Sequence, residues 1–220
     1  MLIKLSKEYL IMAELKNPDY LVLVNRDHKV PDNWLDTVEF VETKNTIPEG
    51  VELNENTRYL ADQTFKLEKK TMEAFLALQA ALKEEGITIL LDSTYRSVQD
   101  QQDIWDLFVK LRGIDYVRQY AAVPGTSEHH TGLAIDVCAV KDGRIINDND
   151  EMIAEEELFS RIHKRLPEFG LILRGPKGKE EIIGYAAEPW HFRYVGVEAA
   201  KEMAEHDFVL EEYLEWKSKQ

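Results

Sequence analysis

The sequence has a single cysteine, Cys138, among its 220 residues. One cysteine excludes an internal disulfide and fits a reducing compartment. It also excludes a closed structural zinc site, because such sites are usually dominated by several thiolates. Cys138 lies in an apolar stretch, and no activating base stands near it in the sequence. We therefore interpret it as a core residue and not as a nucleophile.

Long uncharged apolar runs are also missing, and no stretch reaches the ~20 apolar residues that a membrane-spanning helix needs. Near the amino terminus, charges interrupt any run that could form the apolar core of a signal peptide, at Lys4, Lys7, Glu8 and Glu14. We therefore expect a cytoplasmic protein with no membrane span. The alternative is an extracytoplasmic protein whose signal or anchor is missing from this sequence.

Basic side chains are scarce, with 27 Lys and Arg against 41 Asp and Glu and a formal net charge of −14. This balance argues against nucleic acid or an anionic membrane as the main partner. Any anionic ligand would then have to be held by local cations. The length suits one domain better than two, and the chain has neither internal repeats nor low-complexity segments. These features leave the oligomeric state open.

The most informative residues lie in two segments, Ser-Glu-His-His-Thr-Gly-Leu-Ala-Ile-Asp at 127–136 and Glu-Pro-Trp-His at 188–191. Two imidazoles, His129 and His191, and the carboxylate of Asp136 can converge from neighbouring strands. Catalytic zinc typically keeps three such protein ligands and leaves the fourth position to water. Asp136 inside an apolar segment would be costly to bury unpaired, and a metal is its simplest partner. The sequence therefore predicts a catalytic zinc site.

Glu188 stands three residues before His191, close enough to lie beside the metal without binding it. We expect it to act as general base, taking a proton from the zinc-bound water and returning it to the leaving amine. His130 would point away from His129 if this segment is extended, so we interpret it as structural. The same interpretation applies to the isolated histidines His28, His163 and His206.

At these residues the chain resembles the zinc D-alanyl-D-alanine peptidases of the VanY, VanX and VanXY type, together with the related L,D-carboxypeptidases that trim peptidoglycan stems. The family pattern Ser-x-His-x-x-Gly-x-Ala-x-Asp falls on residues 127–136, and its Glu-x-x-His falls on residues 188–191. Its Tyr-Arg-Ser-x-x-x-Gln falls on residues 95–101. One departure is Thr94, where many relatives have glycine.

The resemblance implies further site residues. Arg96 would lie close to the metal, where its planar fork can bind a carboxylate or stabilise a developing oxyanion. Ser127 and Gln101 would supply hydrogen bonds to the peptide, although either could instead only shape a loop. The implied substrate is the terminal D-alanine of a muramyl-type pentapeptide or the dipeptide D-Ala-D-Ala.

Two other functions remain open at this point. An L,D-carboxypeptidase that cuts tetrapeptide stems would carry the same reactive motif. A non-catalytic, zinc-dependent binding module could also use this fold. The presence of Glu188 argues against the binding module, because a binder has no need of a proton shuttle.

The pattern of apolar residues predicts a mixture of strands and helices without regular alternation. We predict strands at residues 21–24, 38–41 and 87–91. We predict helices at residues 57–85, from the Ser97 capping box onward, and at 198–219. The basic stretch 174–179 is interpreted as a solvated hairpin loop.

These elements favour a single α+β domain, with a small central antiparallel sheet that is flanked by helices and carries the zinc site. Within the domain we expect N-terminal strands and loops at 1–56, a catalytic core at 57–196 and a C-terminal helical segment at 197–220. The resemblance implies the same architecture.

Overall fold

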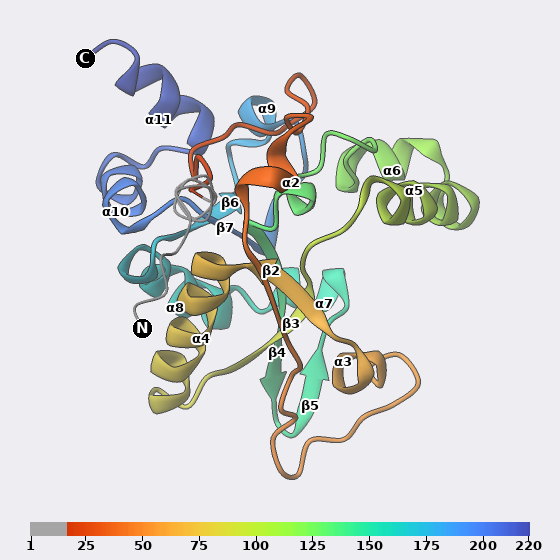
Figure 1. The fold of residues 1–220 in the computed structure, drawn as a ribbon. Helices are drawn as coiled ribbons and strands as arrows, with labels where there is room; N and C mark the ends of the chain where they lie inside the picture. Colours follow the sequence, from red (N-terminus) through yellow and green to blue (C-terminus); the bar gives the residue numbers. More distant parts are fainter. Residues whose placement is uncertain (1–16) are drawn as a thin grey trace, which may run out of the picture.

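The computed structural model describes residues 17–220, so the charged positions discussed near the amino terminus lie outside the described residues (Figure 1). A five-stranded antiparallel sheet has the strand order β3-β4-β7-β6, with β5 paired to β4. Its strands are β3 (Thr88–Ser93), β4 (Ala134–Lys141), β5 (Arg144–Ile146), β6 (Leu171–Gly175) and β7 (Glu188–Tyr194). A separate antiparallel pair consists of β1 (Phe40–Thr43) and β2 (Phe65–Glu68).

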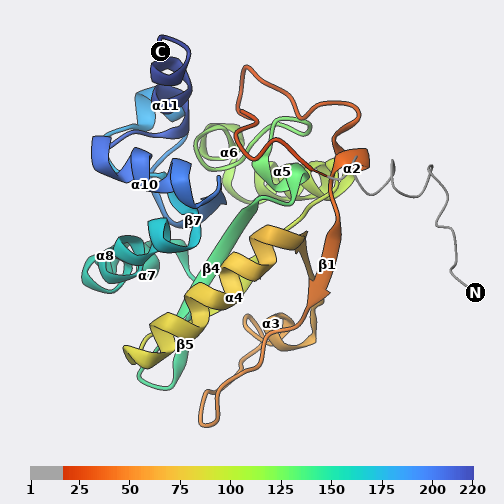
Figure 2. The same ribbon diagram turned by 60° about the vertical axis from the view of Figure 1, so that its left-hand side comes forward.

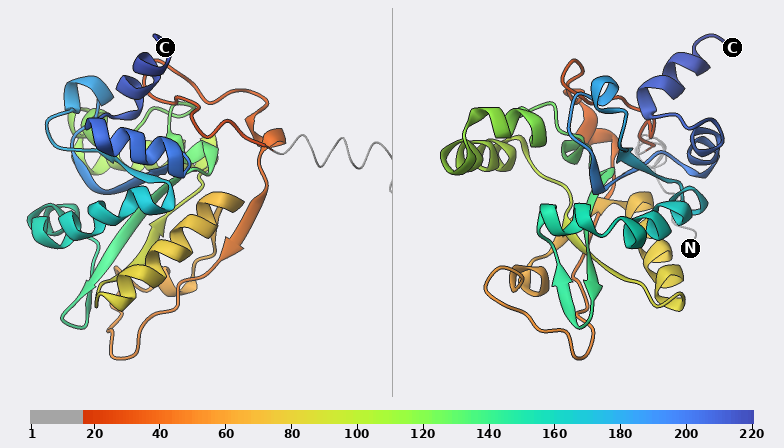
Figure 3. Two further views of the ribbon diagram at one scale, coloured as in Figure 1. Left: turned by 90° about the vertical axis from the view of Figure 1, so that its left-hand side faces the viewer. Right: turned by 180° about the vertical axis from the view of Figure 1, so that it is seen from behind.

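Helices surround these strands. They are α2 (Trp34–Thr37), α3 (Tyr59–Asp62), α4 (Lys69–Glu84), α5 (Val98–Arg112), α6 (Ile114–Tyr120), α7 (Asn149–Ala154), α8 (Glu156–Arg165), α9 (Glu180–Ile183), α10 (Val197–His206) and α11 (Leu210–Lys217), with the 3₁₀ helices η1 (Glu128–Thr131) and η2 (Leu166–Phe169). Helix α4 runs along the sheet (Figure 2). Helices α5 and α6 lie on one flank, and α10 and α11 lie on the other (Figures 1 and 3). The predicted α+β class with antiparallel sheets flanked by helices is confirmed.

The main core lies between α4, α8 and the sheet. Phe75 and Leu78 of α4, Phe159 of α8 and Phe192 of β7 are at most 1% exposed and belong to one cluster. Burying a side chain of this size stabilises a fold by about 1.5–3 kcal/mol. This packing holds β4 and β7 in place, and both strands carry predicted metal ligands.

Several local predictions are confirmed. The strand predicted at 87–91 is β3, and the strand predicted at 38–41 overlaps β1. Ser97 and Asp100 form the predicted capping box, with both reciprocal hydrogen bonds present at the start of α5. Cys138 is fully buried. Within residues 17–220 no helix is long and apolar enough to cross a membrane.

The single helix predicted at 57–85 is wrong, because α3 ends at Asp62 and strand β2 precedes α4. The side chains of Phe65 and Leu67 are fully buried, and Lys66 between them is only partly buried. This alternation is typical of a strand, and pairing with β1 outweighs the local helix propensity of the surrounding residues.

Residues 21–24 form no strand, so that prediction is also wrong. The carbonyl of Val22 instead accepts a hydrogen bond from the buried side chain of Arg193. The helix predicted at 198–219 is two helices, α10 and α11. They are separated at Asp207, whose φ of 54° lies in the left-handed region and ends α10.

Candidate metal and catalytic site

The register of β4 and β7 places two of the three predicted ligands, Asp136 and His191, side by side. Asp136 pairs directly with His191, so their side chains project from the same face of the sheet. His129 comes from η1, a 3₁₀ helix and not the extended segment considered above. Gly132 ends η1 with a φ of 74°, and a Cβ there would collide with the ring of Phe40. This turn allows His129 to approach the sheet.

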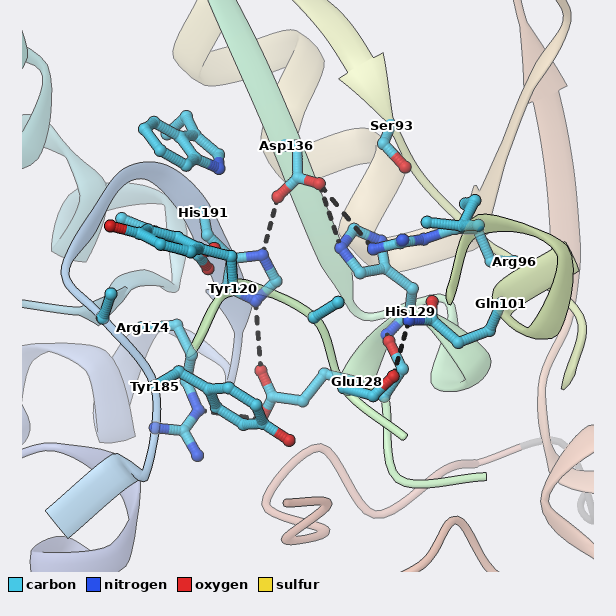
Figure 4. Close-up of a pocket in the computed structure, with 18 of the residues that line it drawn as sticks. Ser93, Arg96, Gln101, Tyr120, Glu128, His129, Asp136, Arg174, Tyr185 and His191 are labelled. Atoms are coloured by element: carbon cyan, nitrogen blue, oxygen red, sulfur yellow. Dashed lines mark hydrogen bonds and ion pairs between the residues drawn. The ribbon is translucent and has the colours of Figure 1, made fainter. Parts of the chain in front are cut away.

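One ligand atom from each of His129, Asp136 and His191 lies within 4.8 Å of the other two. His129 Nε2 is 3.2 Å from Asp136 Oδ2, and His191 Nδ1 is 2.7 Å from Asp136 Oδ1 (Figure 4). The far nitrogen of each ring has another partner. His129 Nδ1 is 2.7 Å from the carbonyl oxygen of Thr94, and His191 Nε2 is 3.5 Å from Glu128 Oε2. His129 Nε2 and His191 Nδ1 are therefore the atoms that converge beside the Asp136 carboxylate.

The electrostatics of this group suit a divalent cation. Burial and the nearby charge of Arg96 lower the pKa of His129 to about 4, so the ring is neutral and can offer a lone pair. Burial opposes ionisation of Asp136, but the two histidines hold its pKa well below the usual range. Burial also opposes protonation of His191, yet Asp136 raises its pKa to about 10. The space between the imidazoles and the carboxylate thus favours positive charge.

All the predicted site residues line one pocket with a volume of about 300 Å³, namely Arg96, Gln101, Ser127, His129, Asp136, Glu188 and His191. A pocket of this size is at the lower end of the range for small-molecule sites. The structure therefore brings together residues that are widely separated in the sequence, and it does so without exception for this set.

Glu188 opens β7 and faces the same pocket as His191. The pairing of β6 with β7 shifts register between Gly175, opposite Glu188, and Leu173, opposite Phe192. Such an irregularity re-aims side chains relative to a regular pleat. Burial raises the pKa of Glu188 to about 7. A carboxyl group that titrates near neutrality can both accept and release a proton.

Arg96 lies in the loop between β3 and α5. Its Nη2 is 3.9 Å from Asp136 Oδ2, and its buried Nε has no hydrogen-bond partner among residues 17–220. Two hydrogen bonds of the Arg96 backbone fix this loop. The amide of Arg96 donates to the carbonyl of His129, and the carbonyl oxygen of Arg96 lies 2.8 Å from His130 Nδ1. His130 therefore supports the loop, which is the structural role predicted for it.

Ser127 and Gln101 each make a structural contact. Ser127 Oγ accepts a hydrogen bond from the His129 amide at 3.3 Å and so caps η1. Gln101 Nε2 donates to the carbonyl of Ala122 at 2.8 Å, whereas its buried Oε1 lacks a partner in the described part of the chain. Gln101 thus keeps one acceptor for a ligand. Thr94, the departure from the family pattern, accepts a bond from the Lys66 amide through Oγ1.

The sequence did not predict the roles of Glu128 and Arg174, which also line the pocket. Arg174 is 6% exposed and its Nε donates to Glu128 Oε1 at 2.9 Å. The prediction of a solvated loop at 174–179 is therefore wrong for Arg174, which belongs to β6. Its position directly after the apolar Leu171–Leu173 was a signal for burial, but nothing local identifies its partner.

Comparison with known proteins agrees with this geometry. The VanY family, described as D-alanyl-D-alanine carboxypeptidase, matches residues 64–197. The chain belongs to this family. The matched segment contains every residue of the predicted site, from Arg96 to His191.

The bifunctional D-Ala-D-Ala dipeptidase and D-Ala-D-Ala carboxypeptidase VanXYC of Enterococcus gallinarum is 39% identical over 127 residues, or 57% of this chain. The chain spans 65% of the length of that curated relative. A mutant of the vancomycin resistance D,D-pentapeptidase VanY, solved in complex with Zn(II), has a TM-score of 0.67 at 30% identity, covering 89% of this chain and 98% of that one. The LD-carboxypeptidase LdcB has a TM-score of 0.67 at 32% identity, covering 89% of this chain and 86% of that one.

Proposed function

We propose that the protein is a zinc-dependent D,D-carboxypeptidase or dipeptidase that hydrolyses the terminal D-Ala-D-Ala bond of peptidoglycan precursor peptides or of the free dipeptide. The observation that carries this proposal is the convergence of His129, Asp136 and His191 beside the partly buried Glu188 in one pocket. Membership of the VanY family supports the reaction, and VanXYC supports the D-Ala-D-Ala substrate. The Zn(II) complex of VanY supports the choice of metal.

The three converging residues fit zinc. His129 Nε2, His191 Nδ1 and a carboxylate oxygen of Asp136 provide two nitrogen donors and one oxygen donor, which is typical of a catalytic site with an open position. When bound in such a site, zinc polarises a carbonyl oxygen and makes a water molecule more acidic. The remaining work falls to side chains of the protein.

Glu188 transfers a proton from the attacking water to the leaving amine. As water attacks the carbonyl carbon of the scissile peptide bond, a carboxylate oxygen of Glu188 accepts one of its protons. When the C–N bond breaks, Glu188 gives this proton to the amine nitrogen of the departing D-alanine, and the electron pair of the bond stays with that nitrogen. The raised pKa, about 7, makes both protonation states accessible near neutral pH.

Arg96 and Gln101 orient the peptide. The guanidinium of Arg96 stabilises negative charge on the scissile carbonyl or on the substrate carboxylate, and its unpartnered Nε remains available for such a contact. Gln101 Oε1 accepts a hydrogen bond from a peptide N–H, whereas Ser127 shapes the pocket wall through its cap on η1. The small pocket suits the end of a short peptide.

The test is hydrolysis by the zinc-loaded protein of D-Ala-D-Ala, a pentapeptide ending in D-Ala-D-Ala, and the corresponding tetrapeptide, followed by mass spectrometry. We expect release of D-alanine from the dipeptide or the pentapeptide, and release at least roughly 100-fold slower with Glu188→Gln. Cleavage of the tetrapeptide alone would replace the proposal with an L,D-carboxypeptidase. Zinc binding without cleavage of any of the three would indicate a binding module.

A further inference from the structure

Glu128 directly precedes the predicted metal ligand His129, and the two oxygens of its carboxylate have different partners. It is 7% exposed. Its Oε1 accepts hydrogen bonds from Arg174 Nε at 2.9 Å and from Arg193 Nη1 at 2.7 Å. Its Oε2 faces His191 Nε2 at 3.5 Å (Figure 4). We propose that Glu128 is a positioning residue that fixes the tautomer and the orientation of His191 for metal binding, an inference that rests on the zinc site of the proposed function.

The charges around Glu128 determine which ring nitrogen of His191 keeps its hydrogen when a metal is bound. Two guanidinium groups on one oxygen keep the Glu128 carboxylate without a proton, so this carboxylate can only accept hydrogen bonds. The nitrogen of His191 that faces it must then carry the hydrogen, and that nitrogen is Nε2. In the metal-free ring Nδ1 also carries a hydrogen, which it donates to Asp136 at 2.7 Å; zinc would take the place of that hydrogen, while Nε2 keeps its own. A carboxylate behind a ligating histidine both orients the ring and increases its basicity.

The position of Glu128 is itself fixed by distant parts of the chain. Arg193, which is fully buried, also donates through Nη2 to the carbonyls of Tyr20 and Val22. Arg174 donates through Nη2 to Glu211 of α11 at 2.6 Å. The two arginines and the two glutamates balance in charge, as a buried ionic group requires. The segment around residue 20 and helix α11 therefore belong to the support of the metal site.

The two metal-binding histidines are held by different means. His129 donates from Nδ1 to the backbone carbonyl of Thr94, a group that no side-chain substitution removes. His191 depends on a side chain, that of Glu128. Substitution of Glu128 should therefore disturb His191 selectively and leave the tautomer of His129 unchanged.

A measurement on the wild-type protein tests the tautomer directly. In zinc-loaded protein with ¹⁵N-labelled histidine, long-range proton–nitrogen NMR correlations distinguish the protonated ring nitrogen from the metal-bound one. We expect His191 to be protonated at Nε2 and metal-bound at Nδ1, and His129 to show the opposite arrangement. His191 bound through Nε2 would overturn the inference.

Variants test the role of the carboxylate. Glu128→Gln removes its charge, and Glu128→Asp keeps the charge but shortens the reach to His191. Zinc affinity, measured by competition with a chromogenic chelator, should fall roughly 10- to 100-fold in Glu128→Gln, as is usual when a carboxylate behind a ligating histidine is lost. Glu215→Gln is the matched control, because Glu215 is exposed on α11 and pairs with Lys219, outside the contacts of Glu128 and Arg174. Its zinc affinity should not change.

The visible spectrum of the cobalt-substituted protein adds a readout of ligand geometry that a general loss of stability would not shift. The spectrum should change in both Glu128 variants and stay unchanged in Glu215→Gln. If Glu128→Gln does not fold without metal, judged by circular dichroism, Glu128→Asp decides the question alone. Wild-type affinity and an unchanged cobalt spectrum in a folded Glu128 variant would overturn the inference. Failure of the wild-type protein to bind zinc would instead overturn the proposed function.

Discussion

Replacing Glu188 by glutamine should strongly slow turnover and yet stabilise the metal-free protein. Glutamine has nearly the shape of glutamate, so the pocket and the three metal ligands stay in place. The substitution removes the ability to take up a proton. Loss of a general acid–base group usually lowers the rate by roughly 10²- to 10⁴-fold, and we expect kcat to fall within that range while zinc content stays the same.

The effect on stability follows from the pKa of Glu188, which burial raises from 4.5 to about 7. Above that pH the wild-type fold holds an ionised carboxylate that would be better solvated in the unfolded chain. At about 1.36 kcal/mol per pKa unit, this costs at most about 3 kcal/mol. Below pH ~4.5 the group is protonated in both states and the cost disappears. The stabilisation by Glu188→Gln should therefore be absent in acid, appear as the pH rises through 4.5, and be complete above about 7.

The assay is urea denaturation of chelator-treated wild-type and variant protein across this pH range, beside steady-state kinetics of the zinc-loaded forms. Glu181→Gln on α9 is a suitable control, because Glu181 is exposed and should change neither quantity. A stability difference that does not vary with pH would show that folding does not raise the pKa of Glu188. Near-normal turnover in Glu188→Gln would refute its assignment as the proton carrier.

Three further predictions concern the proposed metal ligands, Arg96 and the partly buried His163. Zinc content should be about one per chain, and elemental analysis should find it lowered in His129→Ala, Asp136→Ala and His191→Ala; undiminished zinc would refute the ligand set. Arg96→Lys should lower kcat/KM for a D-Ala-D-Ala-terminated peptide roughly 10- to 100-fold, because an ammonium group cannot reproduce a two-pronged contact; unchanged kinetics with intact zinc would make Arg96 structural. Burial lowers the pKa of His163, whose Nε2 is 2.8 Å from the carbonyl of Pro189, so the unfolded chain binds a proton more readily than the fold. The stability advantage of wild type over His163→Phe in urea denaturation should therefore shrink as the pH falls below about 6.5, and an advantage that does not depend on pH would contradict this.

The grouping of the candidate site residues could be predicted from the sequence because the chemistry restricts residue types within short segments. Three ligands and a general base need two imidazoles and two carboxylates, and these stand in two segments, 127–136 and 188–191. The similarity to a known family added Arg96, Ser127 and Gln101. The capping box at Ser97 was likewise readable, since a cap and its partner are three residues apart.

The supporting residues were decided by the tertiary structure. Glu128 pairs with Arg174 and Arg193, which are 46 and 65 residues away, and Arg174 pairs with Glu211 at a separation of 37. The sequence does not indicate which of its many charged residues pair with Glu128 and Arg174. Strand β2 was missed for the same reason, because its pairing with β1 outweighs local helix propensity. The sequence thus determined the candidate groups for the chemistry, whereas the folded arrangement determined what holds them, because long-range pairing depends on distances in space and leaves no local pattern.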